Sequence, residues 1–200
     1  MERISIIIFV LFFPACIGIF KQAIWGTELA HQIIAIAMCL FCVEQGRMAI
    51  KDLQKIAEAK KVVIDTRLDK FYIITVTTII VELLGFYMSS FWLGWGSIII
   101  LLSQVWFNLL AAIKIKISSQ TSAKSIIDII EPWTISERLP VLIADVLGLV
   151  LISFWMLSFS MLKSASFWIS LVLCTMVILY LGIKLASSVS SYLRNRVSLS

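Results

Sequence analysis

The sequence is poor in charge: only 14% of its residues are Asp, Glu, Lys or Arg, whereas 60% are hydrophobic. An ordinary soluble domain is about a quarter charged and about half apolar, so this composition excludes that class. The chain also lacks a glycine-rich phosphate loop, a zinc-binding pattern and a nucleophile motif. We therefore assign no catalytic residue, expect no metal and no cofactor, and favour a non-enzymatic protein over an enzyme.

Only four cysteines occur, and all lie inside apolar runs, so they indicate no disulfide framework. Cys39 and Cys42 do have the spacing of a redox or metal-binding pair, because residues i and i+3 share a helix face. The single histidine, His31, lies eleven residues before Cys42. That is about 16 Å along a helix, which is too far to bind the same ion. We interpret the two thiols as small packing residues, and thiol redox chemistry is the open alternative.

Long apolar runs make up most of the chain, and each is close to the length that a helix needs to cross a bilayer. They predict an all-α integral membrane protein: one membrane domain over 1–200, with about six transmembrane helices arranged as three hairpins. The predicted spans are 4–20, 29–43, 71–88, 97–113, 141–162 and 167–183. The first run contains Cys16 in a context that resembles a lipoprotein cleavage site, but apolar sequence continues to Phe20, so we expect an uncleaved anchor.

Positive charge is distributed unevenly among the segments that connect the spans. Fifteen of the 17 Lys and Arg residues fall in the N-terminus and in segments 44–70, 114–140 and 184–200. Because cytoplasmic segments of membrane proteins carry an excess of Lys and Arg, we expect these segments and both termini to be cytoplasmic. The net charge of +5 follows from this topology. The expected partner is therefore the lipid bilayer, and no nucleic acid is expected.

The segment from Glu44 to Lys70 is the most basic part of the chain. It lacks proline, its only glycine is Gly46, and its apolar residues recur at helical spacing. This pattern predicts a basic amphipathic cytoplasmic helix between spans two and three. Its basic face comprises Arg47, Lys51, Lys55, Lys60 and Lys61. Such a helix can lie on anionic lipid, extend the second span into the cytoplasm, dock a partner or serve as a solvated connector.

Three polar residues interrupt the apolar runs of spans three and four. Glu82 lies about 16 Å into its span, near the middle of the bilayer, and Asn108 lies at a similar depth in the antiparallel neighbour. Gln104 is one helical turn from Asn108 on the same face, so we predict an intramembrane cluster of all three residues. Burial disfavours the charged form of the Glu82 carboxyl group. The cluster is either a polar clamp between two helices or a proton or cation relay.

A further acid, Asp145, lies about 7 Å inside the fifth predicted span. The last hairpin places it opposite Lys184, at the end of span six. We predict an interfacial ion pair between these two residues, with a functional acid as the alternative. Just before the fifth span, Thr134 and Glu137 have the spacing of a helical capping box.

Two stretches carry a resemblance to known proteins: WLGWGSIIILLSQVWFNLLA, from Trp92 to Ala111, and ERLPVLIADVLG, from Glu137 to Gly148. They resemble small uncharacterised multi-pass membrane proteins of cyanobacterial type. The resemblance implies a bacterial plasma membrane or a thylakoid membrane. It implies no activity, so no functional residue is carried over from it.

These observations favour a scaffold, assembly or interaction subunit of a larger membrane complex, with other membrane subunits as its partners. The alternative is a small secondary transporter or channel that uses Glu82, Gln104 and Asn108. A membrane enzyme acting on lipid or quinone is the third hypothesis. It would need an acid, a base or a metal cluster at the cytoplasmic interface, and the residues that gather there are Asp145, Glu137 and Arg138.

Overall fold

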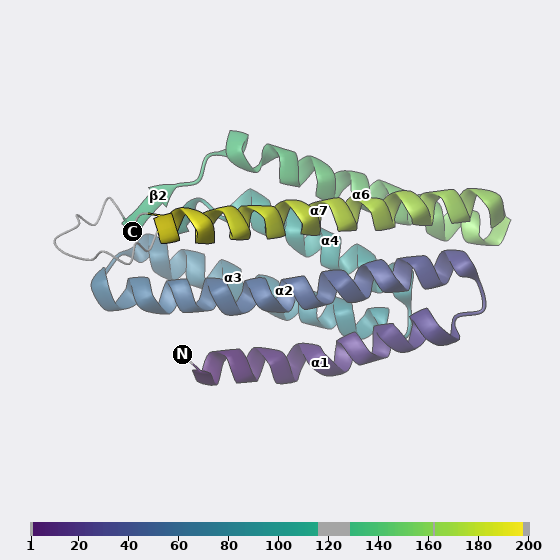
Figure 1. Cartoon of the computed structure of the whole chain (residues 1–200), viewed down its shortest axis with the longest axis horizontal. Coiled ribbons are helices and arrows are strands. Elements are labelled where there is room, and N and C mark those ends of the chain that lie inside the picture. The colour runs from purple at the N-terminus through teal and green to yellow at the C-terminus, as the bar shows by residue number, and fades with distance from the viewer. Residues whose placement is uncertain (1, 116–128, 162, 198–200) are drawn as a thin grey trace.

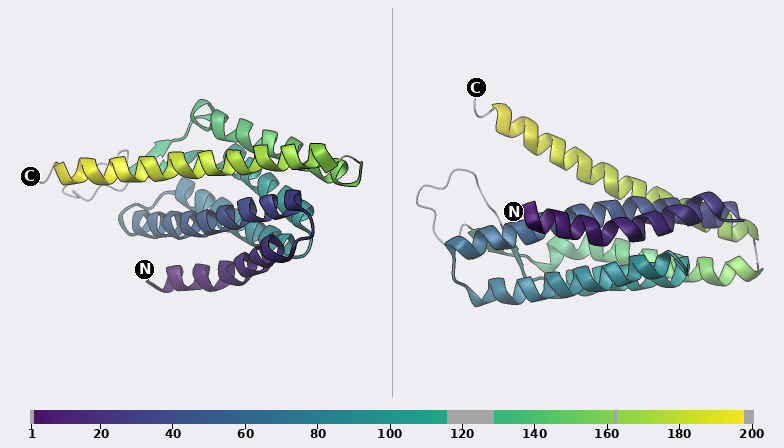
Figure 2. Two further views of the ribbon diagram at one scale, coloured as in Figure 1. Left: turned by 45° about the vertical axis from the view of Figure 1, so that its right-hand side comes forward. Right: turned by 90° about the horizontal axis from the view of Figure 1, so that it is seen from below.

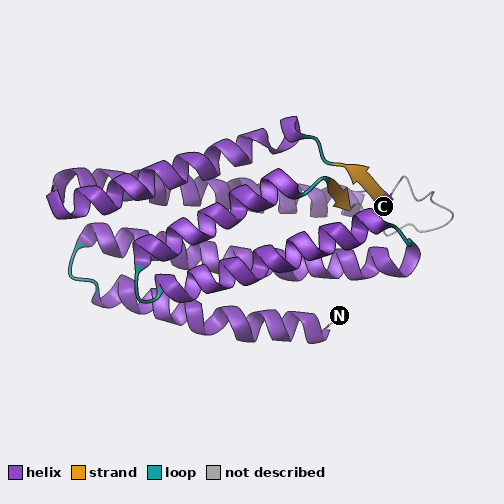
Figure 3. Ribbon diagram, turned by 180° about the vertical axis from the view of Figure 1, so that it is seen from behind, coloured by secondary structure: helices purple, strands orange, loops and turns teal. Residues whose placement is uncertain are grey.

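The computed structural model describes residues 2–115, 129–161 and 163–197. Its helices are α1 (Glu2–Trp25), α2 (Leu29–Val62), α3 (Thr66–Ser89), α4 (Leu93–Leu110), α6 (Ile135–Met161) and α7 (Lys163–Val197). All six are long and apolar enough to cross a membrane. The helical fold class and the six apolar helices predicted from the sequence are therefore confirmed, and Figure 3 shows how completely helix dominates the molecule.

The six helices form an elongated bundle of three hairpins, in which α1 packs on α2, α3 on α4 and α6 on α7. The hairpins pack on one another through α2 with α7, α4 with α6, and α1 with α3. Because the number of helices is even, α1 begins and α7 ends at the same end of the bundle (Figure 1). The connection from α2 to α3 lies at that end too. We call it the basic end, because most of the Lys and Arg residues gather there.

The helices extend beyond the spans predicted from hydropathy. The clearest case is α6, which begins at Ile135 rather than at Val141. Glu137 accepts a hydrogen bond from the backbone N–H of Thr134 (3.3 Å), one half of the capping box that the sequence indicates. At the other end of the chain, α7 continues to Val197, and its C-terminal part projects away from the other helices (Figure 2). Hydropathy marks only the apolar part of a helix, whereas backbone hydrogen bonding continues into its polar turns.

The basic helix predicted between spans two and three does not form an element of its own. The structure instead continues α2 to Val62 and begins α3 at Thr66, so the basic segment is shared between the ends of two long helices. The break between them is made by Asp65, whose carboxylate accepts a hydrogen bond from the Arg67 backbone N–H (2.8 Å) and so caps α3. Of the alternatives open at the sequence level, extension of the second span is the one the structure contains.

A small antiparallel ladder at the basic end was not predicted. The strands β1 (Ile113–Ile115) and β2 (Ile130–Pro132) pair Ile113 with Pro132 and Ile115 with Ile130. They connect α4 to α6 and appear in orange in Figure 3. Their isoleucines pack against Ile56 of α2 and Leu68 of α3 in a second apolar core. The fourth span therefore ends at Leu110 rather than at residue 113, and residues 116–128 of the predicted cytoplasmic segment lie outside the described residues.

Apolar side chains cover the outside of the bundle as well as its core. The main core contains Phe12 of α1, Ile34 of α2, Phe86 of α3, Ile100 of α4 and Ile152 of α6. Large hydrophobic side chains are exposed on the outer faces of all six helices. Soluble monomers rarely expose contiguous apolar patches of this extent, so the surface favours a lipid environment.

Candidate functional site

Carboxyl groups from three helices lie inside the bundle. Glu82 of α3 is 3% exposed and Asp145 of α6 is 9% exposed, while Asp52 of α2 is partly buried. Asp52 and Asp145 both lie within electrostatic range of Glu82. A carboxylate in an apolar interior is costly unless it has hydrogen-bond partners, a counter-charge or water. The partners of these acids therefore decide what the interior can do.

Glu82 is hydrogen-bonded to α4, because the side-chain amide of Gln104 donates from Nε2 to Glu82 Oε1. The two residues face each other since α3 and α4 form a tight antiparallel hairpin. Glycine makes this close approach possible: a Cβ at Gly85 would lie 2.6 Å from Ile100 Cγ1 and 3.1 Å from the carbonyl oxygen of Gly96. The structure thus brings together two of the three residues of the predicted intramembrane cluster.

Asn108 has a different partner from the one predicted. Its Nδ2 donates to Asp145 Oδ2 (2.9 Å) of α6, not to Glu82. The reason is the position of α4, which packs against α3 on one side and against α6 on the other. Asn108 lies one turn further along α4 than Gln104 and is turned toward α6. The two amides of α4 therefore hold two acids from different helices.

Asp145 is buried inside the bundle, next to the last turn of α4. Because α6 begins at Ile135, Asp145 lies ten residues into the helix, or about 15 Å from its start. The ion pair predicted between Asp145 and Lys184 stays a prediction. The Lys184 ammonium lies 5.5 Å from the ring centroid of Tyr180.

The sequence analysis missed the role of Arg138. This residue is 5% exposed, and its Nη1 donates to the backbone carbonyl oxygens of Asn108 (2.6 Å) and Leu109 (3.5 Å). These carbonyls belong to the last turn of α4, where the helix dipole favours a cation. The guanidinium carbon also lies 5.6 Å from the ring centroid of Trp133. A basic residue in the first turn of one helix can cap the end of its neighbour, but no local pattern in the sequence indicates which neighbour.

The basic end contains ion pairs rather than carboxyl–amide pairs. Lys60 of α2 pairs there with Asp69 of α3 (2.7 Å), whereas Arg47, also of the predicted basic face, pairs with the buried Glu44 (2.6 Å) near the middle of α2. The rest of the predicted basic face is exposed and comprises Lys51, Lys55 and Lys61. The face is therefore cationic overall, although two of its five charges are compensated.

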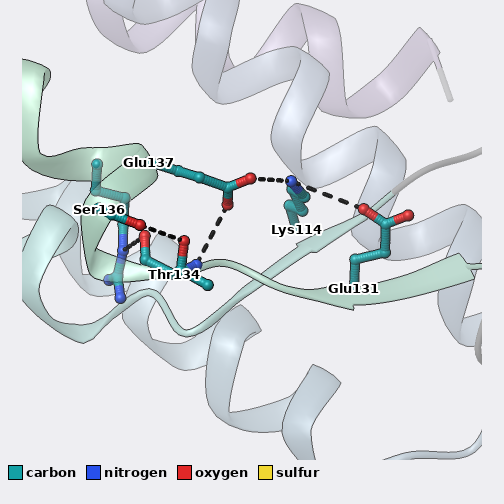
Figure 4. A network of polar contacts seen from close by, with 6 residues as sticks. Lys114, Glu131, Thr134, Ser136 and Glu137 are labelled. Carbon is teal, nitrogen blue, oxygen red and sulfur yellow. Dashed lines mark hydrogen bonds and ion pairs between the residues drawn. The ribbon is translucent and has the colours of Figure 1, made fainter.

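The β-ladder adds a second set of ion pairs at the same end. Lys114 lies between Glu137 (2.8 Å) and Glu131 (3.7 Å), as Figure 4 shows. The hydrogen bond from its ammonium to the Glu137 carboxylate raises the pKa of Lys114 above its ordinary value. Glu137 and Lys114 thereby tie the start of α6 to β1. Glu137, one of the residues considered for a membrane enzyme, therefore takes part in an ion-pair network at the start of α6.

The cysteine pair of α2 faces α1. Cys39 Sγ lies 3.4 Å from Cys16 Sγ, and the Cys42 thiol contacts the carbonyl oxygen of Phe12 (3.9 Å). Both contacts lie in the packed interface of the first hairpin. Among the described residues, no group of three or more His, Cys, Asp or Glu side chains has the arrangement of a metal site.

Comparisons with protein-family models, with curated proteins and with solved structures found no match for this chain.

Proposed function

We propose that this chain is a multi-pass membrane protein whose basic end and both termini face the cytoplasm. The six apolar helices support the first part, and the excess of Lys and Arg at one end supports the second. The resemblance to cyanobacterial-type proteins supports a bacterial plasma or thylakoid membrane. Impermeant labelling of a cysteine introduced at Thr66 and of one introduced at Thr27 tests the orientation, because only the second should react from outside intact cells.

Within that membrane, we propose that the protein is a small secondary transporter or channel that carries protons or cations past Glu82. The observation that supports this function best is the pairing of Glu82 with a neutral amide. The hydrogen bond recorded for its carboxyl group comes from Gln104, and no basic side chain joins it among the described contacts. A buried acid held by an arginine or lysine would stay ionised, whereas one held by an amide can take up and release a proton.

Asp145 and Asp52 add two further acids within electrostatic range of Glu82. Asp145 is likewise held by an amide, that of Asn108, and Asp52 lies in α2 toward the basic end. Glu82 rarely ionises together with either of these acids, because like charges repel strongly in a medium of low dielectric constant. Ionisation of one acid therefore favours protonation of the next, which is the property a proton relay needs.

Purified protein in liposomes tests this function. Ion-driven acidification of the lumen is followed with a pH-sensitive dye under an imposed proton, Na⁺ or K⁺ gradient. Glu82→Gln should abolish the flux, because the amide keeps the shape of the side chain and cannot carry a proton. Asp69→Asn is the matched control: it is the same chemical change on the same helix, at an exposed position, and should leave the flux intact.

Two results would overturn the transporter proposal: absence of flux from wild-type protein under all three gradients, or equal flux from wild type and Glu82→Gln. The scaffold role favoured by the sequence stays a prediction. Its test is purification in a mild detergent, where a stable companion subunit is expected. A lone polypeptide would remove its support.

A further inference from the structure

A small polar cavity lies beside Glu82, between α2, α3 and α4. Its volume is about 40 Å³. Its polar lining residues are Gln45, Asp52, Thr75, Thr78, Glu82 and Gln104. Met48 of α2 and Phe107 of α4 lie among its apolar walls, and the Tyr180 hydroxyl of α7 contacts the sulfur of Met48 (3.3 Å). The cavity therefore borders on two of the three interior acids.

Gln45 is the residue that indicates a ligand. It is 4% exposed, it lines the cavity, and its Nε2 has no hydrogen-bond partner. A buried amide donor without a partner destabilises the fold, and native proteins usually satisfy such a group with ordered water. A polar cavity needs about 10–15 Å³ per water molecule, so this one has room for two or three.

The other lining groups can complete the coordination of that water. The hydroxyls of Thr75 and Thr78 donate to the backbone carbonyl oxygens of Phe71 (2.9 Å) and Ile74 (2.8 Å). Each hydroxyl oxygen keeps lone pairs that can accept a hydrogen bond from water. The hydrogen bond recorded for Glu82 uses Oε1, which leaves Oε2 for a ligand. Donors and acceptors thus line one space, and water can satisfy both, whereas a bare cation has nothing to offer the Gln45 amide donor.

We propose that this cavity is a binding site for water, and that its water connects Glu82 to Asp52. Asp52 lies within electrostatic range of Lys51, Lys55 and Lys184, all near the basic end of the bundle. Water between the two acids gives Glu82 a route for proton exchange toward that end. The water site stands on the cavity and on Gln45. Its role as an access route rests on the proposed transport function.

Infrared spectroscopy of the full-length protein in lipid nanodiscs tests the water site. The carboxyl band of Glu82 is identified by its loss in Glu82→Gln, and its exchange is then followed after transfer from H₂O to D₂O. Gln45→Leu removes the amide and fills the space with an apolar side chain. We expect the rate of H/D exchange at the Glu82 carboxyl group to fall by at least about tenfold, because contact with water now requires a local opening of the helices.

The matched control is Gln54→Leu, the same change on the same helix at a position that contacts Ser5 rather than the cavity. Exchange in this variant should match wild type. Should Gln45→Leu fail to fold, Ala49→Val fills the same cavity from the next helical turn and should slow exchange in the same direction. Equal exchange in wild type and the cavity variants overturns the proposal. A band shift produced by Na⁺ but not by choline also overturns it, since the cavity then holds a cation.

Flux measured on the same samples separates the two proposals. Fast exchange in wild type without any ion flux supports the water site and contradicts the transporter. Slow exchange with unchanged flux in Gln45→Leu contradicts the access route. Loss of both in Gln45→Leu, with both intact in Gln54→Leu, supports the site and the route together.

Discussion

The exposed acids at the basic end and the buried acids Glu82 and Asp145 have different kinds of partner. At the basic end, Asp69 pairs with Lys60 and Glu137 pairs with Lys114, in contact with solvent. In the interior, Glu82 and Asp145 are instead held by the amides of Gln104 and Asn108. Solvent already stabilises the exposed charges, so their ion pairs add little. The buried acids depend on the neutral dipoles around them, which makes their protonation sensitive to the site.

The largest effect is expected from removing Arg138, a buried cation that contacts the end of α4. Arg138→Met should lower the free energy of unfolding by about 2–3 kcal/mol, because two carbonyl oxygens at the end of α4 lose a charge-assisted hydrogen bond. Lys61→Met, at an exposed position of the basic end, should change it by less than about 0.5 kcal/mol. Denaturant titration in bicelles measures both. Equal losses in the two variants would remove the energetic distinction between the regions.

A second test concerns the packing that holds Gln104 against Glu82. Gly85→Ala should cost about 2 kcal/mol, since the added Cβ meets Ile100 and the backbone of Gly96. Gly182→Ala is its control, because a Cβ there meets nothing within 4 Å. Thermal unfolding of the two variants side by side measures the difference. A stable Gly85→Ala protein would mean that the contact between α3 and α4 is looser than the structure has it.

The third test asks how much the amide partner of an interior acid contributes. Asn108→Leu should cost about 1 kcal/mol, because Asp145 loses its hydrogen bond inside the bundle. Adding Asp145→Leu should recover part of that loss, since the acid no longer needs a partner. A double-mutant cycle on unfolding free energies gives the coupling. Simple additivity of the two changes would show that Asn108 and Asp145 do not depend on each other.

The smallest effect is expected at the exposed pair that joins α2 to α3. Lys60→Met should cost less than about 1 kcal/mol, and the cost should fall as salt is added, because the pair with Asp69 is open to solvent. Unfolding at low and high ionic strength measures it. The interior variant Asn108→Leu should be insensitive to salt in the same experiment. A salt dependence shared by both variants would contradict the distinction between solvent-exposed and buried acidic side chains.

Much of the fold could be predicted because the relevant signals are local. Apolar runs give the helices and their number, and Thr134 with Glu137 gives the start of α6. The ends of the helices were predicted less well, because the apolar run of residues ends before the helical hydrogen bonds of the backbone do. Asp145 shows the difference: it lies four residues into the predicted span but ten residues into α6.

The partners of the interior residues could be predicted only in part. Antiparallel counting in the α3–α4 hairpin placed Asn108 at the depth of Glu82 and Gln104 one turn away, and Gln104 is the one that bonds Glu82. Asn108 and Asp145 lie on helices separated by the β-ladder, and no count along the chain says which face of α4 meets α6. The ladder itself joins residues 113–115 to 130–132, a long-range contact that three-residue strands do not signal.

The ladder also has a practical consequence for anyone handling the molecule. Because Ile115 lies opposite Ile130, the chain leaves β1 and returns in β2 at neighbouring points. An epitope or a fluorescent protein inserted between those two isoleucines would therefore begin and end at two paired, neighbouring residues. The insertion should not strain α4 or α6, so this position is suitable for a tag used in imaging or affinity purification.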